Sequence, residues 1–125
     1  MAILPVRLYG TTAADGTLTV FSEAAYSGKL LAIQWVIGTF AAGVDPTFSV
    51  TSTDGGVDVT LLTVTNADAN ALYHVRHVVH GETGTALTGT SGGDRTCPLV
   101  VGYLKMVVAQ GGNTLTGGAI LYLEV

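Results

Sequence analysis

The chain has 125 residues, of which 48% are hydrophobic and only 11% charged, and its formal net charge is −4, which together predict one domain with no long charged tail. Only five Lys and Arg residues are present and they are scattered, which excludes the clustered basic surface that nucleic acid requires, and the lone Cys97 excludes an internal disulfide and a cysteine-based zinc site. An average soluble domain is about 25% charged, so this shortage predicts a surface that is covered by Ser, Thr, Asn and Gly or buried against other chains.

The N-terminal residues, MAILPVRLYG, read as a first strand. They lack the apolar core of roughly 7–15 residues that a signal peptide places before its cleavage site. The uncharged run at residues 30–44 is 15 residues long, whereas a membrane-spanning helix needs about 20. We therefore expect synthesis in the cytoplasm and no membrane partner.

The rest of the chain alternates apolar and polar residues with a period of two, which is typical of strands, and helix signals are nearly absent. In TFSVTST, Phe48 and Val50 face one way, and in KLLAIQWVI we expect Leu31, Ile33 and Trp35 to share one face. Short turns are predicted within 22–28 and 66–72. The predicted strands are residues 3–9, 16–22, 29–37, 47–53, 57–65, 72–80, 99–110 and 114–125.

Three Gly-containing stretches, TDGGVDV, AQGGNTL and AADGTL, predict hairpin turns, because Gly tolerates positive φ. In VDVTLLTV the alternation slips after Leu61, and a β-bulge there would bring both sets of apolar residues to the core.

About eight strands with tight turns and no crossover helices predict a single-domain antiparallel β-sandwich, with either a jelly-roll or an Ig-like strand order. Residues 81–98, GETGTALTGTSGGDRTCP, form the one long connection. Loops of this length inside a compact domain are usually functional, so we expect this loop to be a contact arm.

Three histidines lie in ALYHVRHVVHGETG and raise the question of a metal or acid–base site. On a strand from residue 72, His74 and His80 share a face but lie about 20 Å apart at about 3.3 Å per residue, and His77 points the other way. A metal site would need ligands from other strands or subunits. We therefore expect a sheet wall, with His74, Arg76 and His80 on its polar face, where an interface could sense pH near 6.

Other chemistries lack their residue patterns. There is no Gly-x-Ser-x-Gly nucleophile elbow, and GTSGGD lacks the lysine and the following helix of a phosphate loop. Trp35 and Tyr26 could form a sugar-binding platform, but Trp35 shares its predicted face with apolar residues and is expected in the core. We expect no catalytic, metal or cofactor site.

Two stretches resemble the small β-rich decoration or cement proteins on the heads of tailed bacteriophages. VRLYGTTAADGTLTVFSEAAYSGKLLAIQWVIG is similar to their opening strand–turn–strand segment, and PLVVGYLKMVVAQGGNTLTGGAILYLEV to their closing hairpin. The resemblance implies a non-enzymatic virion protein, made in the host cytoplasm and attached to the capsid surface, often as a trimer. Its partners would be the major capsid protein or other virion proteins.

The resemblance carries over no functional residues, so the contact candidates come from the sequence alone. They lie in residues 2–7, in the apolar loop 39–44, on the histidine strand and in the loop 82–97, and comprise Ile3, Leu4, Arg7, Phe40, His74, Arg76, His80, Glu82, Leu87 and Arg95. Two alternatives stay open: a carbohydrate- or receptor-binding module of a tail or fibre, and a small β-barrel enzyme with a histidine metal site.

Overall fold

A computed structural model describes residues 2–78 and 95–125, which contain strands and no helix. No helix in these two ranges therefore has the length and apolar character needed to cross a bilayer. The strands are β1 (Ile3–Thr11), β2 (Leu18–Val36), β3 (Asp45–Thr51), β4 (Asp58–Thr63), β5 (Ala71–Tyr73), β6 (His77–Val78), β7 (Arg95–Thr96), β8 (Leu99–Ala109) and β9 (Thr116–Glu124).

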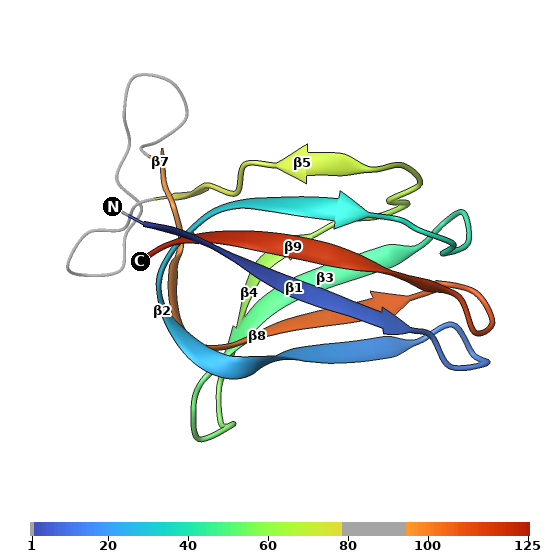
Figure 1. The fold of residues 1–125 in the computed structure, drawn as a ribbon, viewed down its shortest axis with the longest axis horizontal. Helices are drawn as coiled ribbons and strands as arrows, with labels where there is room; N and C mark the ends of the chain where they lie inside the picture. The colour runs from blue at the N-terminus through green and yellow to red at the C-terminus, as the bar shows by residue number, and fades with distance from the viewer. Residues whose placement is uncertain (1, 79–94) are drawn as a thin grey trace.

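The 19-residue strand β2 belongs to two packed layers. Its first arm, up to Lys29, pairs with β8, and its second arm, from Lys29, pairs with β9. Figure 1 shows β2 curving from one arm into the other. The first layer has the order β1-β9-β2-β5, the second layer has the order β2-β8-β3-β4, and all their ladders are antiparallel. The predicted all-β antiparallel sandwich is confirmed.

The strand order decides between the two sandwich types left open by the sequence. Counting the two arms of β2 separately gives eight strand segments, and in each layer an early strand lies beside a late one: β1 beside β9, and the first arm of β2 beside β8. Two interleaved four-stranded layers of this kind form a jelly roll.

Two of the three predicted hairpins are wrong in pairing, although the chain turns where expected. The turn at residues 13–16 joins β1 to β2, and the turn at 110–113 joins β8 to β9, but neither pair is hydrogen-bonded together. Both turns carry the chain from one layer to the other. Only the turn at 53–56 closes a true hairpin, between β3 and β4.

The predicted break within residues 22–28 is also wrong, because β2 runs through it with a bulge between Phe21 and Ala25. The buried Ser22 hydroxyl accepts a hydrogen bond from the Leu104 N–H and donates one to the Ala24 carbonyl. These two bonds bridge the irregularity, so the strand continues.

The core lies between the layers, with Trp35 at its centre and fully buried. Its ring stacks on Phe40 at 5.6 Å between centroids and meets Phe48 edge-on at 6.3 Å. Trp35 Nε1 donates a 2.9 Å hydrogen bond to the Ala67 carbonyl, which satisfies its polar group. The predicted core position of Trp35 is confirmed.

Two apolar positions on β2 and β4 differ from the predicted pattern. A bulge after Leu30 turns Leu31 outward, whereas Leu30 is fully buried. The predicted bulge at Leu61 is confirmed, because Phe48 pairs with Leu62 while the next β3 residue pairs with Thr60. It buries Leu61 but leaves Val57 and Val59 more than half exposed, because β4 is the edge of its layer.

Gly102 marks a close approach between β8 and the end of β3. Its φ is +134°, and a Cβ there would collide with the Thr51 carbonyl oxygen. We expect Gly102→Ala to lower the free energy of unfolding by about 2 kcal/mol. Gly55→Ala is the matched control, because Gly55 also has a positive φ but faces open space; it should cost about 1 kcal/mol. Urea unfolding compares the two, and equal losses would contradict the close-approach account.

Candidate functional site

The outer side of the first layer carries several apolar side chains that no described residue covers, beside the polar Arg7 and Gln34. Residues of β1 and β9 alternate, so that Val6, Leu8, Leu121 and Leu123 are buried and their neighbours point outward. We define the outer apolar face by the outward side chains Ile3, Leu31, Leu72, Ile120 and Tyr122. Ile3 and Leu72 are each more than half exposed.

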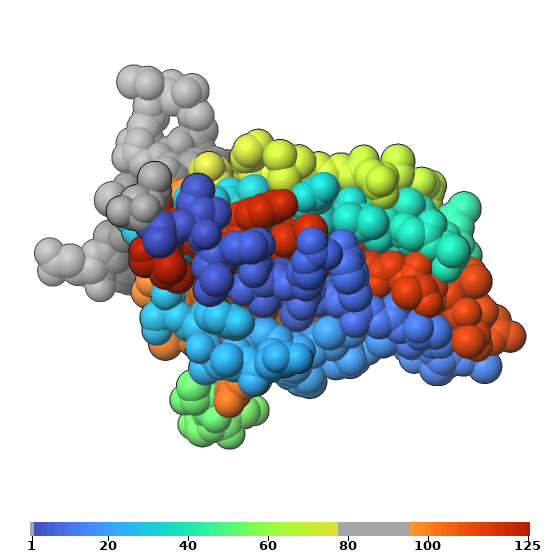
Figure 2. Space-filling view, viewed as in Figure 1, coloured from blue at the N-terminus to red at the C-terminus, as the bar shows by residue number. Residues whose placement is uncertain are grey.

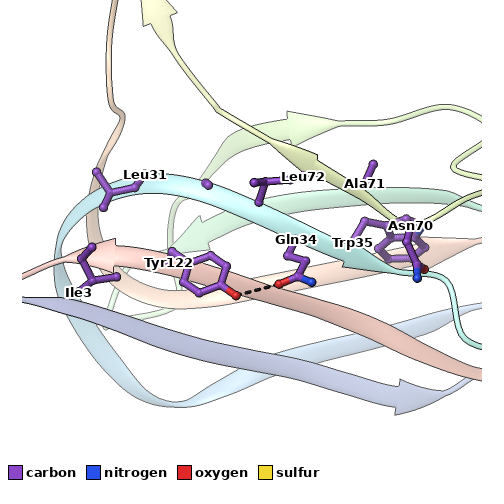
Figure 3. A pocket seen from close by; sticks show the side chains of 9 residues that line it. Ile3, Leu31, Gln34, Trp35, Asn70, Ala71, Leu72 and Tyr122 are labelled. Atoms are coloured by element: carbon purple, nitrogen blue, oxygen red, sulfur yellow. Dashed lines mark hydrogen bonds between the residues drawn. The ribbon is translucent and has the colours of Figure 1, made fainter.

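A hollow of about 540 Å³ opens in this face between β5, β2 and β9. In Figure 3, Leu72 of β5 and Leu31 of β2 border it, and Tyr122 of β9 faces Gln34. The Tyr122 hydroxyl donates a 2.7 Å hydrogen bond to Gln34 Oε1. Because these two polar groups satisfy each other, the walls of the hollow present mainly hydrocarbon.

Such a wall suits the burial of apolar side chains from another protein. It offers no nucleophile paired with a base. Across residues 2–78 and 95–125, no three His, Cys, Asp or Glu side chains gather as metal ligands.

The predicted N-terminal contacts divide between the two sides of β1. Ile3 and Arg7 point outward, and the Arg7 guanidinium lies over the Tyr9 ring, 5.8 Å from its centroid. Leu4 points inward and packs against the core. Phe40, predicted as an exposed contact in an apolar loop, is buried against Trp35 and belongs to the core.

The histidine segment is not one continuous strand, which corrects the prediction for residues 72–80. β5 ends at Tyr73, and the chain then crosses from the first layer toward the second. Val75 is buried, and His77 Nε2 lies 2.8 Å from the Leu61 carbonyl oxygen of β4. Because the segment leaves β2 to reach β4, it cannot continue the ladder.

His74 and Arg76 are exposed, as the sequence predicted. Arg76 Nη1 donates hydrogen bonds to the Leu31 carbonyl at 2.9 Å and to the Val75 carbonyl at 2.7 Å. Arg76 therefore caps the bulge of β2 at the border of the outer apolar face.

The remaining predicted contacts come from the long connection. His80, Glu82 and Leu87 lie outside the described residues. The backbone of Arg95 pairs with that of Val78 in the small β6-β7 sheet, while its side chain is outside the described part.

The outer side of the second layer carries Thr47, Thr51 and Thr60 on β3 and β4, and the exposed apolar residues Leu99 and Val101 on β8. Asp58 accepts hydrogen bonds from the Thr51 hydroxyl at 2.6 Å and from Lys105 Nζ at 3.0 Å. These two contacts, that of Thr51 first, hold the pKa of Asp58 below its usual value of 3.8. The pKa of Asp54 is also lowered, by hydrogen bonds from Ser52 and the Gly56 N–H.

These depressed pKa values predict acid sensitivity. A carboxyl group with a lower pKa in the folded chain stabilises it above the unfolded pKa, and this contribution is lost as the pH falls below 3.8 through the folded pKa. We expect the thermal midpoint to fall in that window, and to fall less steeply in Asp58→Asn. Parallel midpoint curves for the variant and the wild type would contradict this assignment.

One signal in the sequence indicates the outer apolar face, and the predictions missed it. In GGAILYLEV of β9, apolar residues occupy successive positions and do not alternate with polar ones. Such continuous runs are typical of strands covered on both sides. Ile120 and Tyr122 belong to the second set, which faces outward.

No family model and no curated protein matches the chain. Among solved structures, it is similar to CBM32-3 from a family 31 glycoside hydrolase from Clostridium perfringens, with a TM-score of 0.41 and 14% sequence identity over 94% of this chain and 74% of that one. A similarity at this level supports no conclusion about function.

Proposed function

We propose that the chain is a non-enzymatic structural protein of a tailed-phage virion, which decorates the capsid by docking its outer apolar face on the shell. The resemblance of its opening and closing segments to head decoration proteins suggests the setting. The outer apolar face suggests the means of attachment, and it is the observation that carries the proposal.

Energetics favour protein contact at this face. Full burial of an exposed Leu or Ile side chain contributes about 1.5–3 kcal/mol before ordering costs. Ile3 and Leu72 are more than half exposed in the isolated chain, so a partner that covers them recovers part of that energy. Covering this face also accounts for a surface with so few charges.

The second layer would then face solvent. The Thr residues and the Lys105–Asp58 ion pair on its outer side stay hydrated without a partner. We propose a trimer on the capsid surface, with the major capsid protein or another virion protein as the partner.

Co-sedimentation with bare phage heads that lack this chain tests the proposal. We expect saturable binding at a fixed number of copies per head, and light scattering of the untagged protein should give the mass of a trimer. Binding that does not saturate, or no binding to heads of the phage that encodes the chain, would contradict the proposal.

A further inference from the structure

A second hollow lies between the edges of the two layers, and its β1 wall borders the outer apolar face. β1 pairs only with β9, and the first arm of β2 pairs only with β8, among the described residues. Figure 2 shows the dark blue atoms of β1 beside the lighter blue atoms of this arm. We define the β1–β2 groove, with a volume of about 410 Å³, by its lining residues Pro5, Val6, Arg7, Tyr9, Val20, Phe21, Glu23 and Tyr26.

Aromatic rings stand on both walls of the β1–β2 groove. Tyr9, from β1, is 40% exposed and Phe21, from β2, is 51% exposed, while Tyr26 is partly buried. The sequence suggested a platform of Tyr26 with Trp35, but Trp35 is in the core. Tyr9 and Phe21 supply the exposed rings in its place.

Charged side chains of both signs, Arg7 and Glu23, also line the groove. Neither forms an ion pair with another described residue, since the ion pair found there joins Lys105 to Asp58. Arg7 offers only hydrogen-bond donors, whereas ionised Glu23 offers only acceptors. Glu23 would repel an anionic ligand and Arg7 would repel a cationic one. A neutral ligand rich in both hydrogen-bond donors and acceptors therefore fits best.

We propose that the β1–β2 groove binds a neutral oligosaccharide. Arg7 lies over one face of Tyr9 and Lys105 over one face of Phe21, so the C–H faces of pyranose rings would pack on the opposite faces of these two rings. Hydroxyl groups would accept hydrogen bonds from Arg7 and donate them to Glu23. The β2 wall of the groove is separate from shell docking, because Phe21 and Glu23 lie outside the outer apolar face.

A peptide that added as a strand to the free edge of β1 would compete for the groove. The hydrogen-bonding pattern along β1 disfavours such a strand. Ala2 and Val125 form a pair that exchanges two backbone hydrogen bonds. The backbone N–H and C=O groups of every second residue from Ala2 onward therefore point toward β9. The backbone groups of Pro5, Arg7 and Tyr9 therefore face the groove. Pro5 has no N–H and interrupts the donor row that an added strand would need.

Affinity electrophoresis through gels that contain single neutral polysaccharides (glucan, mannan, galactan or soluble chitin oligomers) tests the proposal. We expect at least one to retard the wild-type protein. Phe21→Ala and Glu23→Gln should each weaken that binding about tenfold or more. Val101→Ala is the matched control, because Val101 is 58% exposed on the outer side of the second layer and outside the groove; it should bind like the wild type.

Three results would overturn the proposal: no retardation in any gel, equal retardation of both groove variants and the wild type, or binding of acidic polysaccharides alone. A fourth would favour strand addition, namely extended peptides that shift the Arg7 and Tyr9 amide NMR signals when no sugar does. Because shell docking does not use Phe21 or Glu23, co-sedimentation of these two variants with heads should be unchanged whichever result is obtained.

Discussion

Under the proposed function, replacement of Leu72 by Glu is expected to weaken attachment to the virion shell by about 30-fold or more, since truncating a central apolar anchor typically costs about 2 kcal/mol of binding. Leu72 is 54% exposed and borders the hollow in the outer apolar face. A carboxylate there would be buried without a partner on docking, which adds a desolvation cost. Co-sedimentation at increasing protein concentration gives the ratio of dissociation constants.

Val101→Glu is the matched control for this prediction, because it places the same charge at a similarly exposed apolar site on the second layer. Both variants should keep the free energy of unfolding within about 0.5 kcal/mol of the wild type, as surface substitutions usually do. Equal binding by Leu72→Glu and the wild type would show that the first layer is not the docking side. Equal losses in the two variants would point to a general charge effect.

Replacement of Trp35 by Ala is expected to lower the free energy of unfolding by about 3–5 kcal/mol. Trp35 has no exposed surface and packs on Phe40 and Phe48, and its indole N–H donates a hydrogen bond to the Ala67 carbonyl. The cavity would leave these two rings without their largest neighbour. Single domains are stable by about 5–15 kcal/mol, so the variant should be close to unfolding at room temperature.

Trp35→Phe separates the hydrogen bond from the packing. It keeps an aromatic ring but leaves the buried Ala67 carbonyl without its donor, which costs about 1–3 kcal/mol. Its loss should therefore be smaller than that of Trp35→Ala in urea unfolding. A loss below about 1 kcal/mol for Trp35→Ala would contradict the central place of this side chain in the core.

Local patterns predicted most of the strands, but not how they are joined in layers. The alternation around Phe48, the core position of Trp35 and the bulge at Leu61 could all be read from neighbouring residues. Turn chemistry predicts where a chain reverses, and not which strand it then pairs with. The continuity of β2 depends on the Ser22 hydroxyl bonding to Leu104, a contact between distant residues that alternation does not encode.

The same limit applies to the candidate sites. Ile3 and Arg7 were expected to be contacts and do lie on the outward side of β1, whereas Phe40 turned inward because its ring fills the space beside Trp35. The outer apolar face combines β1, β2, β5 and β9, and the β1–β2 groove combines the edges of both layers. These combinations follow from the jelly-roll order, which the sequence left open.

Electron cryomicroscopy of heads decorated with the wild-type protein tests the central claim most directly, because it shows which side of the sandwich meets the shell. The proposed function predicts ordered copies at symmetric positions, with Leu72 and Tyr122 against the shell and the Thr-rich side of the second layer toward solvent. Copies that meet the shell through the second layer, or heads without any ordered density for this chain, would contradict it.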